Sequence, residues 1–287
     1  MLGQGGGALR AALEHDPGHG VAGAVGTAAH WAALGLVLDF HYTSMTYFLL
    51  PAQTTALIGN GSFTRVLYRT LELTLAPVLR LVYRPEITGL AHVPRSGPVI
   101  IAANHISFAD EIFTPLAARR QVLYFAKAEY FNTPGIRGRA MAAFFRGCGH
   151  VPVERADTRS AAGVIDIGVE LLSGGGALGI YPEGTRSPDG RLYKFRTGVA
   201  RLALRSGAPV VPVGLIGTRE VQPPGTHRWH RRPVGVHFGP PLYFGDRAAE
   251  ERSSRVLREV TETVRHAVQG LSGQSYVDAF AAAGTRA

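Results

Sequence analysis

Cysteine is almost absent from this sequence, which contains Cys148 and no other. One thiol cannot build a disulfide framework within the chain, and it cannot provide the paired cysteines of a Cys-based zinc site. The lack of such a framework fits a reducing compartment such as the cytosol. No sequence context marks Cys148 as a nucleophile, so we expect a small buried residue there.

Several functional signatures are also missing from the sequence. There is no phosphate loop ending in Gly-Lys-Ser/Thr, no Gly-x-Ser-x-Gly elbow and no Cys–His zinc pattern. The chain has no internal repeat, and it lacks the interleaved aromatic and basic residues of RNA-binding sheets. These absences disfavour a P-loop nucleotidase, a typical serine hydrolase and an RNA-binding module.

Lysine is scarce although the chain is strongly basic. Of 30 basic residues, Lys127 and Lys194 are the only lysines, and the formal net charge is +9. This excess favours an anionic partner such as nucleic acid, acidic lipid headgroups or a phosphorylated small molecule. Arginine suits two-pronged recognition of phosphate, although a GC-rich genome produces the same bias.

The first 60 residues lack an uninterrupted apolar run. Residues 31–50 are largely apolar, but Asp39 and His41 interrupt them. A central Asp costs about 2.5–3.5 kcal/mol on insertion scales, and a membrane span needs ~20 mostly apolar residues. The segment also lacks the basic start of a secretory signal. We therefore expect residues 1–60 to form an interfacial or loosely ordered extension. A transmembrane helix is the less favoured alternative, and a natural start at Met45 is another.

Residues 62–84 are predicted to form an amphipathic helix. Ser62 can cap its start, and Pro77 is expected to kink or divide it. The polar stripe contains Arg65, Arg69, Glu72, Arg80 and Arg84. The apolar residues broadly opposite are Leu67, Leu71, Leu75, Val78 and Val82. We expect residues 61–86 to be a membrane-interface helix or helix pair. The alternative is an ordinary surface helix packed on the domain.

From residue 87 to residue 287 the sequence alternates between strand-like and helix-like segments. The expected strands are 98–103, 122–126, 150–153, 177–181, 209–214 and 234–238. The expected helices are 108–119, 135–147, 160–173, 198–207 and 247–271. This order predicts an α/β domain with a single mixed sheet covered by helices. Ligands of such sheets bind beyond the carboxyl ends of the strands.

The stretch NHISFAD, residues 104–110, follows a strand directly and places His105 at this ligand edge. Asp110 can fold back against the imidazole, fix its tautomer and leave Nε2 as a free base. A structural alternative is a capping box formed by Ser107 and Asp110, which would start a helix without any chemistry.

Three further strands end in polar or turn-forming corners. Residues 177–190, ALGIYPEGTRSPDG, offer backbone N–H groups, hydroxyls and a guanidinium, which together can bind a phosphate ester. Strand 150–153 delivers Glu154 and Arg155, and strand 209–214 points at the same edge. The basic loop GTHRWHRRP, residues 225–233, could touch phosphate or lipid, but a solvated loop is the commoner explanation.

Four stretches, NHISFAD, GHVPVER, YPEGTRS and VVPVGLIG, resemble in this order the four blocks of the 1-acyl-glycerol-3-phosphate acyltransferase family. The resemblance extends from about residue 87 to about residue 244. The first and third blocks are the specific ones. The second block departs slightly, because Glu154 stands where the family often has Asp. The first 60 residues have no counterpart in the resemblance.

The resemblance implies transfer of a fatty acyl group from acyl-CoA or acyl carrier protein to a hydroxyl of a lysophospholipid. His105 would be the general base and Asp110 its partner, and a backbone N–H near Gly184 would hold the oxyanion. Ser107 would only cap a helix, and no cofactor or metal is expected. The residues implied for the acceptor phosphate are Lys127, Arg155, Glu183, Gly184, Thr185 and Arg186.

The most expected acceptor is 1-acyl-glycerol-3-phosphate, which would give phosphatidate. Alternatives within the superfamily are glycerol 3-phosphate, another lysolipid, an amino-acid lipid or a glycolipid. A serine-type lipid hydrolase and a non-catalytic membrane-binding protein are more distant alternatives. Because both substrates are amphiphiles, we expect an anionic membrane surface as a partner, with the protein peripheral or monotopic on the cytoplasmic face.

Overall fold

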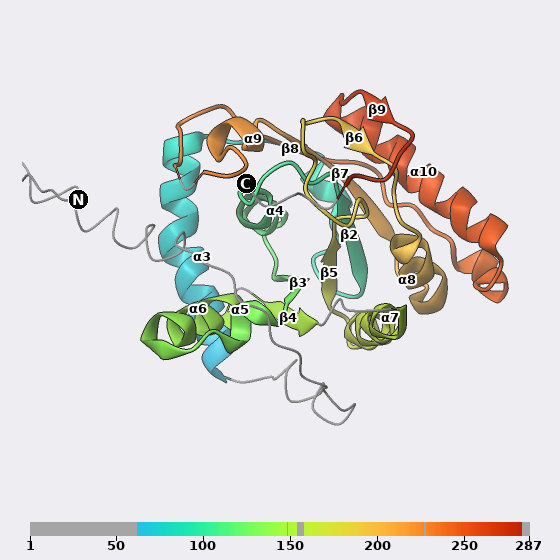
Figure 1. Cartoon of the computed structure of the whole chain (residues 1–287), viewed down its shortest axis with the longest axis horizontal. Helices are drawn as coiled ribbons and strands as arrows, with labels where there is room; N and C mark the ends of the chain where they lie inside the picture. Colours follow the sequence, from blue (N-terminus) through green and yellow to red (C-terminus); the bar gives the residue numbers. More distant parts are fainter. Residues whose placement is uncertain (1–61, 148, 154–157, 227, 283–287) are drawn as a thin grey trace, which may run out of the picture. The chain divides into compact units, whose positions relative to one another are not determined.

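A seven-stranded mixed sheet forms the centre of the computed structural model (Figure 1). The structure describes residues 62–147, 149–153, 158–226 and 228–282. The amino-terminal extension, Cys148, Glu154 and Arg155 therefore lie outside the described residues. The strand order is β1-β8-β7-β2-β5-β3-β4, and every neighbouring pair is parallel except β7 and β8. This arrangement confirms the single mixed sheet expected from the sequence.

The strands of the sheet are β1 (Glu86–Thr88), β2 (Val99–Ala103), β3 (Val122–Lys127), β4 (His150–Val153), β5 (Ala177–Ile180), β7 (Val210–Ile216) and β8 (Gly235–Phe238). A separate parallel pair is formed by β6 (Leu192–Tyr193) and β9 (Tyr276–Val277). The helices are α3 (Ser62–Tyr83), α4 (Asp110–Ala118), α5 (Glu129–Asn132), α6 (Gly135–Gly147), α7 (Thr158–Ser173), α8 (Gly198–Ser206), α9 (Thr218–Val221) and α10 (Ser254–Ser272). Two short 3₁₀ helices are η2 (Leu90–His92) and η3 (Gly245–Glu250).

Helices cover both faces of the sheet, which explains why β2 is apolar at every position. Val99, Ile101 and Ala103 face a core that contains α4 residues and the edge of Tyr83 from α3. Ile100 and Ala102 face the opposite core, which is built from α7, α8 and α10 (Figure 1). A parallel strand buried on both faces needs a continuous apolar run rather than an alternating one.

The helix expected over residues 62–84 is present as α3, and of the two expected effects of Pro77, a kink or a division, the division does not occur. Proline removes one intrahelical hydrogen bond, to the carbonyl four residues earlier. That residue is Leu73, which lies on the solvent side of the helix with 74% of its surface exposed. Water can solvate the released carbonyl there, so the helix continues.

Two other details differ from the sequence-based expectation. The single helix expected over 247–271 is instead η3 followed by α10, and Ser253 caps α10 by accepting from the backbone N–H of Val256. Strand β1 was not expected, because its three residues carry no apolar pattern. Among the described residues, none of the helices has the length and apolarity required to cross a bilayer.

Candidate active site

The candidate site lies where β2 and β7 end side by side, and the side chain of Asn104 joins the two strands there. Asn104 donates from Nδ2 to the carbonyl of Leu215 at 2.9 Å and accepts from the backbone N–H of Leu215 at 2.7 Å. The buried amide thus continues the sheet pairing by one residue beyond Ala103. These hydrogen bonds fix the point along the strand direction at which the chain leaves the sheet, just before His105.

His105 and Asp110 are in contact. The imidazole Nδ1 lies 2.9 Å from Oδ2 of Asp110, whose side chain is fully buried. The imidazole itself is 12% exposed, and its Nε2 has no hydrogen-bond partner among the described residues. If the carboxylate accepts from Nδ1–H, Nε2 is the lone-pair nitrogen and is able to accept a proton.

Asp110 also satisfies the capping interpretation, so the two explanations of this motif are not exclusive. Its Oδ2 accepts from the backbone N–H groups of Ile106 at 2.7 Å and Ser107 at 2.8 Å. The other oxygen accepts from the hydroxyl of Thr218, which begins α9 just after β7. One carboxylate therefore starts α4, holds the loop before it and orients His105.

The two serines of the motifs are buried and already hydrogen-bonded. Ser107 Oγ lies 2.8 Å from the carbonyl of Gln222 and 3.1 Å from its side-chain oxygen, and it accepts from the backbone N–H of Ala109. Ser187 Oγ donates to the carbonyl of Arg191 at 2.7 Å. Neither hydroxyl contacts His105, so neither is activated as a nucleophile in this arrangement.

Glu183 has a different position from the one we expected for a phosphate-binding residue. Its carboxylate is fully buried and accepts from the backbone N–H groups of His105 and Tyr193, each at 2.9 Å. Burial raises the pKa of Glu183 to about 7, and the two backbone donors only partly oppose this shift. The residue holds the His105 loop, and a buried side chain with both oxygens engaged cannot bind phosphate directly.

The expected oxyanion donor was a backbone N–H near Gly184, and the Gly184 amide itself is already engaged. It donates to the carbonyl of Tyr181 at 2.9 Å and closes the turn after β5. Gly184 is required in this turn because its φ is 79° and an added Cβ would lie 2.8 Å from the Arg196 side chain. In the part of the chain that the structure describes, the next two amides, of Thr185 and Arg186, have no hydrogen-bond partner.

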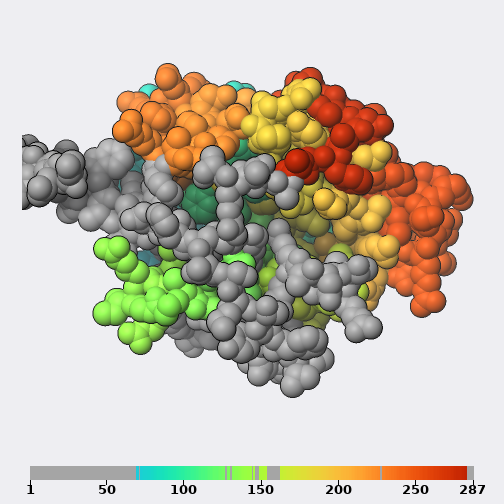
Figure 2. Space-filling view, viewed as in Figure 1, coloured from blue at the N-terminus to red at the C-terminus, as the bar shows by residue number. Residues whose placement is uncertain are grey.

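The loop that contains these amides is tied to α9. Arg219 donates to the carbonyls of Ser187 at 3.2 Å and Pro188 at 2.8 Å. Figure 2 shows the two segments next to each other on one face, in yellow and orange. The backbone N–H of Ser187 donates to the carbonyl of His105 at 2.7 Å. The corners after β2, β5 and β7 thus form one connected site.

A stack of aromatic rings behind His105 was not expected from the sequence. The imidazole lies on the ring of Tyr181 with centroids 4.0 Å apart and an interplanar angle of 12°. Tyr181 stacks on Tyr124 at 5.5 Å, and Tyr124 stacks on His150 at 5.7 Å. Burial raises the pKa of both phenols, so they are neutral at physiological pH. The only sequence signal was the presence of Tyr124, His150 and Tyr181 in adjacent strands or at their ends.

The far end of this stack is hydrogen-bonded to a carboxyl group. His150 Nε2 lies 3.1 Å from Glu111 Oε2, next to Asp110 in the first turn of α4. Burial alone would raise the pKa of Glu111, but the hydrogen bond and charge of His150, with His105 and Arg186 nearby, lower it overall. Arg186 is exposed and has no ion-pair partner among the described residues.

The side chains of two expected phosphate ligands, Lys127 and Arg155, lie outside the described part of the structure. Arg155 lies outside the described residues, and Lys127 is described only as the last residue of β3, without its side chain. Thr185 is half-buried beside Arg186. The described residues contain no group of three or more His, Cys, Asp or Glu side chains suited to a metal ion.

Comparison with known proteins places the chain in a family. A family model described as Acyltransferase matches residues 84–216. A 1-acyl-sn-glycerol-3-phosphate acyltransferase of Pseudomonas aeruginosa is 31% identical over 192 residues, which cover 63% of this chain and 69% of that protein. The chain belongs to the 1-acyl-sn-glycerol-3-phosphate acyltransferase family. This confirms the resemblance carried by the four sequence blocks.

Two further matches differ in how much of each protein they cover. A chloroplastic 1-acyl-sn-glycerol-3-phosphate acyltransferase of Brassica napus is 38% identical over 145 residues, or 50% of this chain. The chain spans only 40% of that relative. The crystal structure of the 1-acyl-sn-glycerophosphate acyltransferase PlsC from Thermotoga maritima matches with a TM-score of 0.53 and 23% identity. It covers 77% of this chain and 90% of PlsC, and this likeness concerns the fold.

The buried Glu183 predicts a specific dependence of stability on pH. Its pKa of about 7 in the folded protein lies above the ordinary value of 4.5 that applies when the chain unfolds. As the pH rises, Glu183 therefore loses its proton in the unfolded chain before it does so in the folded protein. The free energy of unfolding falls as the pH rises towards and through 7. The loss amounts to roughly 2–3 kcal/mol between pH 5 and pH 8.

Glu183→Gln cannot titrate, so this part of the pH dependence should disappear. We expect the unfolding free energy of the wild type, relative to that of the variant, to fall by roughly 2–3 kcal/mol between pH 5 and pH 8. Urea unfolding at the two pH values measures it. Parallel pH dependences of the two proteins would show that Glu183 does not titrate with a raised pKa.

Proposed function

We propose that this protein transfers an acyl group from a thioester to the free hydroxyl of 1-acyl-glycerol-3-phosphate, which gives phosphatidate. The observation that carries the proposal is the contact between His105 and the buried Asp110, which leaves Nε2 without a partner. Nε2 takes the proton of the acceptor hydroxyl as its oxygen attacks the thioester carbonyl. The thiolate leaves, and Asp110 stabilises the imidazolium that forms.

No acyl-enzyme is required, because the acceptor hydroxyl is itself the nucleophile. The serine-hydrolase alternative would need Ser107 or Ser187 as the nucleophile. Both hydroxyls are engaged by other groups and neither reaches the imidazole. The proposed direct transfer uses the side chains in the arrangement that they already have.

The acceptor phosphate is proposed to bind beside Arg186. The guanidinium is exposed and unpaired within the described residues, and the adjacent amides of Thr185 and Arg186 are without partners there. A guanidinium combined with backbone N–H groups recognises phosphate oxygens with charge-assisted hydrogen bonds. Lys127 and Arg155 are proposed to add positive charge to this pocket. Glu183 contributes by holding the loop.

The acceptor is proposed on the basis of the relatives. Those of Brassica napus and Pseudomonas aeruginosa are both named 1-acyl-sn-glycerol-3-phosphate acyltransferases. A glycerol 3-phosphate acceptor has the same phosphate chemistry, so an acceptor panel must separate the two. The donor is proposed to be acyl-CoA or acyl carrier protein.

Helix α3 is proposed to hold the site at the cytoplasmic face of an anionic membrane. Ala76 and Leu79 are buried against the domain, whereas Leu73 and Leu81 are 74% and 70% exposed. Val78 is partly exposed between them. An apolar helix face with arginines at its border is suited to the membrane interface. Both proposed substrates are amphiphiles, so this location would bring them to the site.

The proposed base can be tested by substitution. His105→Ala should lower kcat by about 10²–10⁴-fold, because that is the usual contribution of a positioned general base. Ser107→Ala should keep transfer within about tenfold of the wild type. The assay offers labelled acyl-CoA with a panel of lysolipids and identifies the product by mass spectrometry. If the wild type acylates 1-acyl-glycerol-3-phosphate and His105→Ala retains this activity, the imidazole is not the base. Release of free fatty acid without an acceptor would instead support a hydrolase.

The proposed phosphate site makes a kinetic prediction. Arg186→Ala should raise KM for 1-acyl-glycerol-3-phosphate by about tenfold or more, since charged hydrogen bonds contribute about 1.5–3 kcal/mol. KM for an acceptor without phosphate, such as a monoacylglycerol, should change little. Arg252→Ala is the control, because its side chain is 96% exposed on the loop before α10. Equal changes for both acceptors would place the phosphate elsewhere.

The proposed membrane face is tested with vesicles. The double change Leu73→Glu and Leu81→Glu should reduce co-sedimentation with phosphatidylglycerol vesicles by about tenfold, because it removes apolar contact and adds two negative charges. Tyr243→Glu is a matched control, since this residue is 72% exposed between β8 and η3. Undiminished sedimentation of the double variant would mean that another surface meets the membrane.

A further inference from the structure

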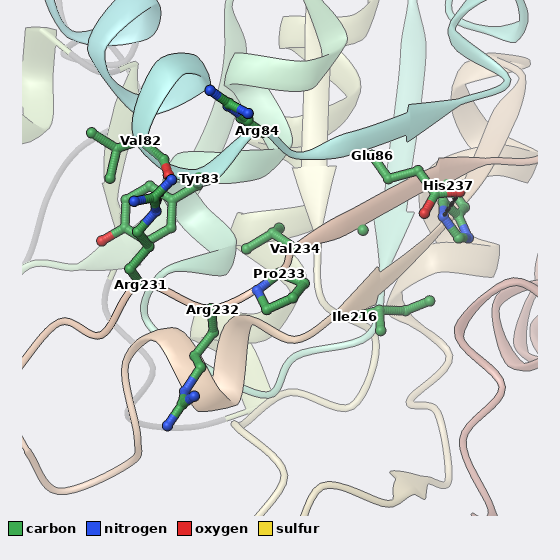
Figure 3. A pocket seen from close by; sticks show the side chains of 11 residues that line it. Val82, Tyr83, Arg84, Glu86, Ile216, Arg231, Arg232, Pro233, Val234 and His237 are labelled. Carbon is green, nitrogen blue, oxygen red and sulfur yellow. Dashed lines mark hydrogen bonds and ion pairs between the residues drawn. The ribbon is translucent and has the colours of Figure 1, made fainter.

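A second pocket lies along the same edge of the sheet, on the side of β8 and β1 (Figure 3). It has a volume of about 540 Å³ and is formed by the end of α3, the ends of β7 and β8, and the segment that leads into β8. Its lining residues are Val82, Tyr83, Arg84, Glu86, Ile216, Arg231, Arg232, Pro233, Val234, Gly235 and His237. Ligand sites commonly have volumes of ~300–1,000 Å³.

Three arginines give this pocket its charge. Arg84 and Arg232 have no ion-pair or side-chain hydrogen-bond partner among the described residues. Within the described residues, Arg231 donates only from Nε, to the carbonyl of Val82 at 3.0 Å, so its two terminal nitrogens have no partner there. Guanidiniums without an ion-pair partner are suited to bind phosphate groups, and here they come from two separate parts of the chain.

The backbone around Arg84 places it at this site. Arg84 adopts a left-handed conformation with φ of 45°, which few non-glycine residues do. Its N–H still donates to the carbonyl of Arg80, so the turn directly ends α3. The negative end of the helix dipole favours the nearby guanidiniums of Arg84 and Arg231 and helps to keep them together.

The rest of the pocket is largely apolar and separates the arginines from the one carboxylate. Figure 3 shows Pro233 and Val234 in the middle, the arginines on one side, and Glu86 and His237 on the other. Glu86 Oε1 lies 3.8 Å from Nε2 of His237. Ile216 adds an apolar surface that is 40% exposed. The arginines suit a ligand with several phosphates, and the apolar residues suit a flat, less polar part of the same ligand.

Measured along the strand direction, the pocket and His105 lie at nearly the same position. Ala103 pairs with Val213, so His105, two residues further on, is near the level of Leu215, one residue before Ile216, which lines the pocket. β8 and β1 lie two and three strands away from β2 in the sheet order. At ~4.8 Å between strands, the lateral separation is about 10–15 Å. A ligand that reaches both places needs a long linker between its phosphates and its reacting group.

We propose that this pocket binds the phosphorylated nucleotide end of a coenzyme A thioester. The pantetheine arm of such a donor separates the 3′-phosphate, the pyrophosphate and the adenine from the thioester carbonyl. The arginines bind the phosphates, the apolar floor meets the base, and the arm runs along the strand ends to His105. This inference rests on the proposed acyl transfer and assigns its donor to coenzyme A. The acceptor phosphate at Arg186 uses a separate corner.

The decisive measurement compares two donors. Acyl-pantetheine carries the same thioester and arm but no nucleotide. Arg84→Glu with Arg232→Glu should lower the ratio of kcat/KM for acyl-CoA to that for acyl-pantetheine by about tenfold or more. Arg231 is left intact, because it also caps α3. The control Arg252→Glu makes the same kind of charge change and should leave the ratio unaltered. An unaltered ratio in the double variant would overturn the proposal.

A binding measurement separates this proposal from the proposed function. Calorimetry with adenosine 3′,5′-bisphosphate requires no acyl transfer, and the wild type should bind it at least tenfold more tightly than the double variant. Equal affinities would overturn the assignment even if the enzyme is active. If the double variant instead loses only binding to phosphatidylglycerol vesicles, the pocket recognises a lipid headgroup. If it loses only turnover of acyl carrier protein, the pocket recognises an acidic carrier, and either result rejects the nucleotide.

Discussion

The buried carboxylate of Asp110 is the interaction on which the site depends. It accepts from the imidazole of His105, two backbone N–H groups and the hydroxyl of Thr218. A buried charge is costly unless it is hydrogen-bonded, and four donors offset this cost. These donors come from the loop after β2 and from the start of α9 after β7. The same carboxylate therefore fixes the fold locally and sets the direction of the imidazole.

Glu183 fixes the backbone of His105, whereas Asp110 fixes its imidazole. It holds the backbone N–H of His105, and the carbonyl of His105 accepts from Ser187. The ring is fixed by Asp110 at Nδ1 and by Tyr181 beneath its face. With backbone and ring both held, Nε2 has little freedom to move. Such support is what keeps a reacting group within a fraction of an ångström of its working position.

The sequence predicted the features that depend on short stretches. Six apolar runs became strands of the sheet, and NHISFAD placed His105 and Asp110 within reach of each other. It could not predict features set by distant partners. Glu183 and Gly184 looked like phosphate ligands, but contacts with His105, Tyr193 and Tyr181 occupy them. Arg84 and Arg232, distant in sequence, line one pocket because β1 pairs with β8.

The two carboxyl groups that flank His105 and Asp110 differ in their pKa values for physical reasons. His150 lowers the pKa of Glu111, so Glu111 carries its charge throughout the neutral range. Burial raises the pKa of Glu183 to about 7, so its charge changes within that range. Deprotonation of Glu183 adds negative charge next to the backbone N–H of His105. The environment of a fixed imidazole can thus vary with pH through a residue that does not touch the substrate.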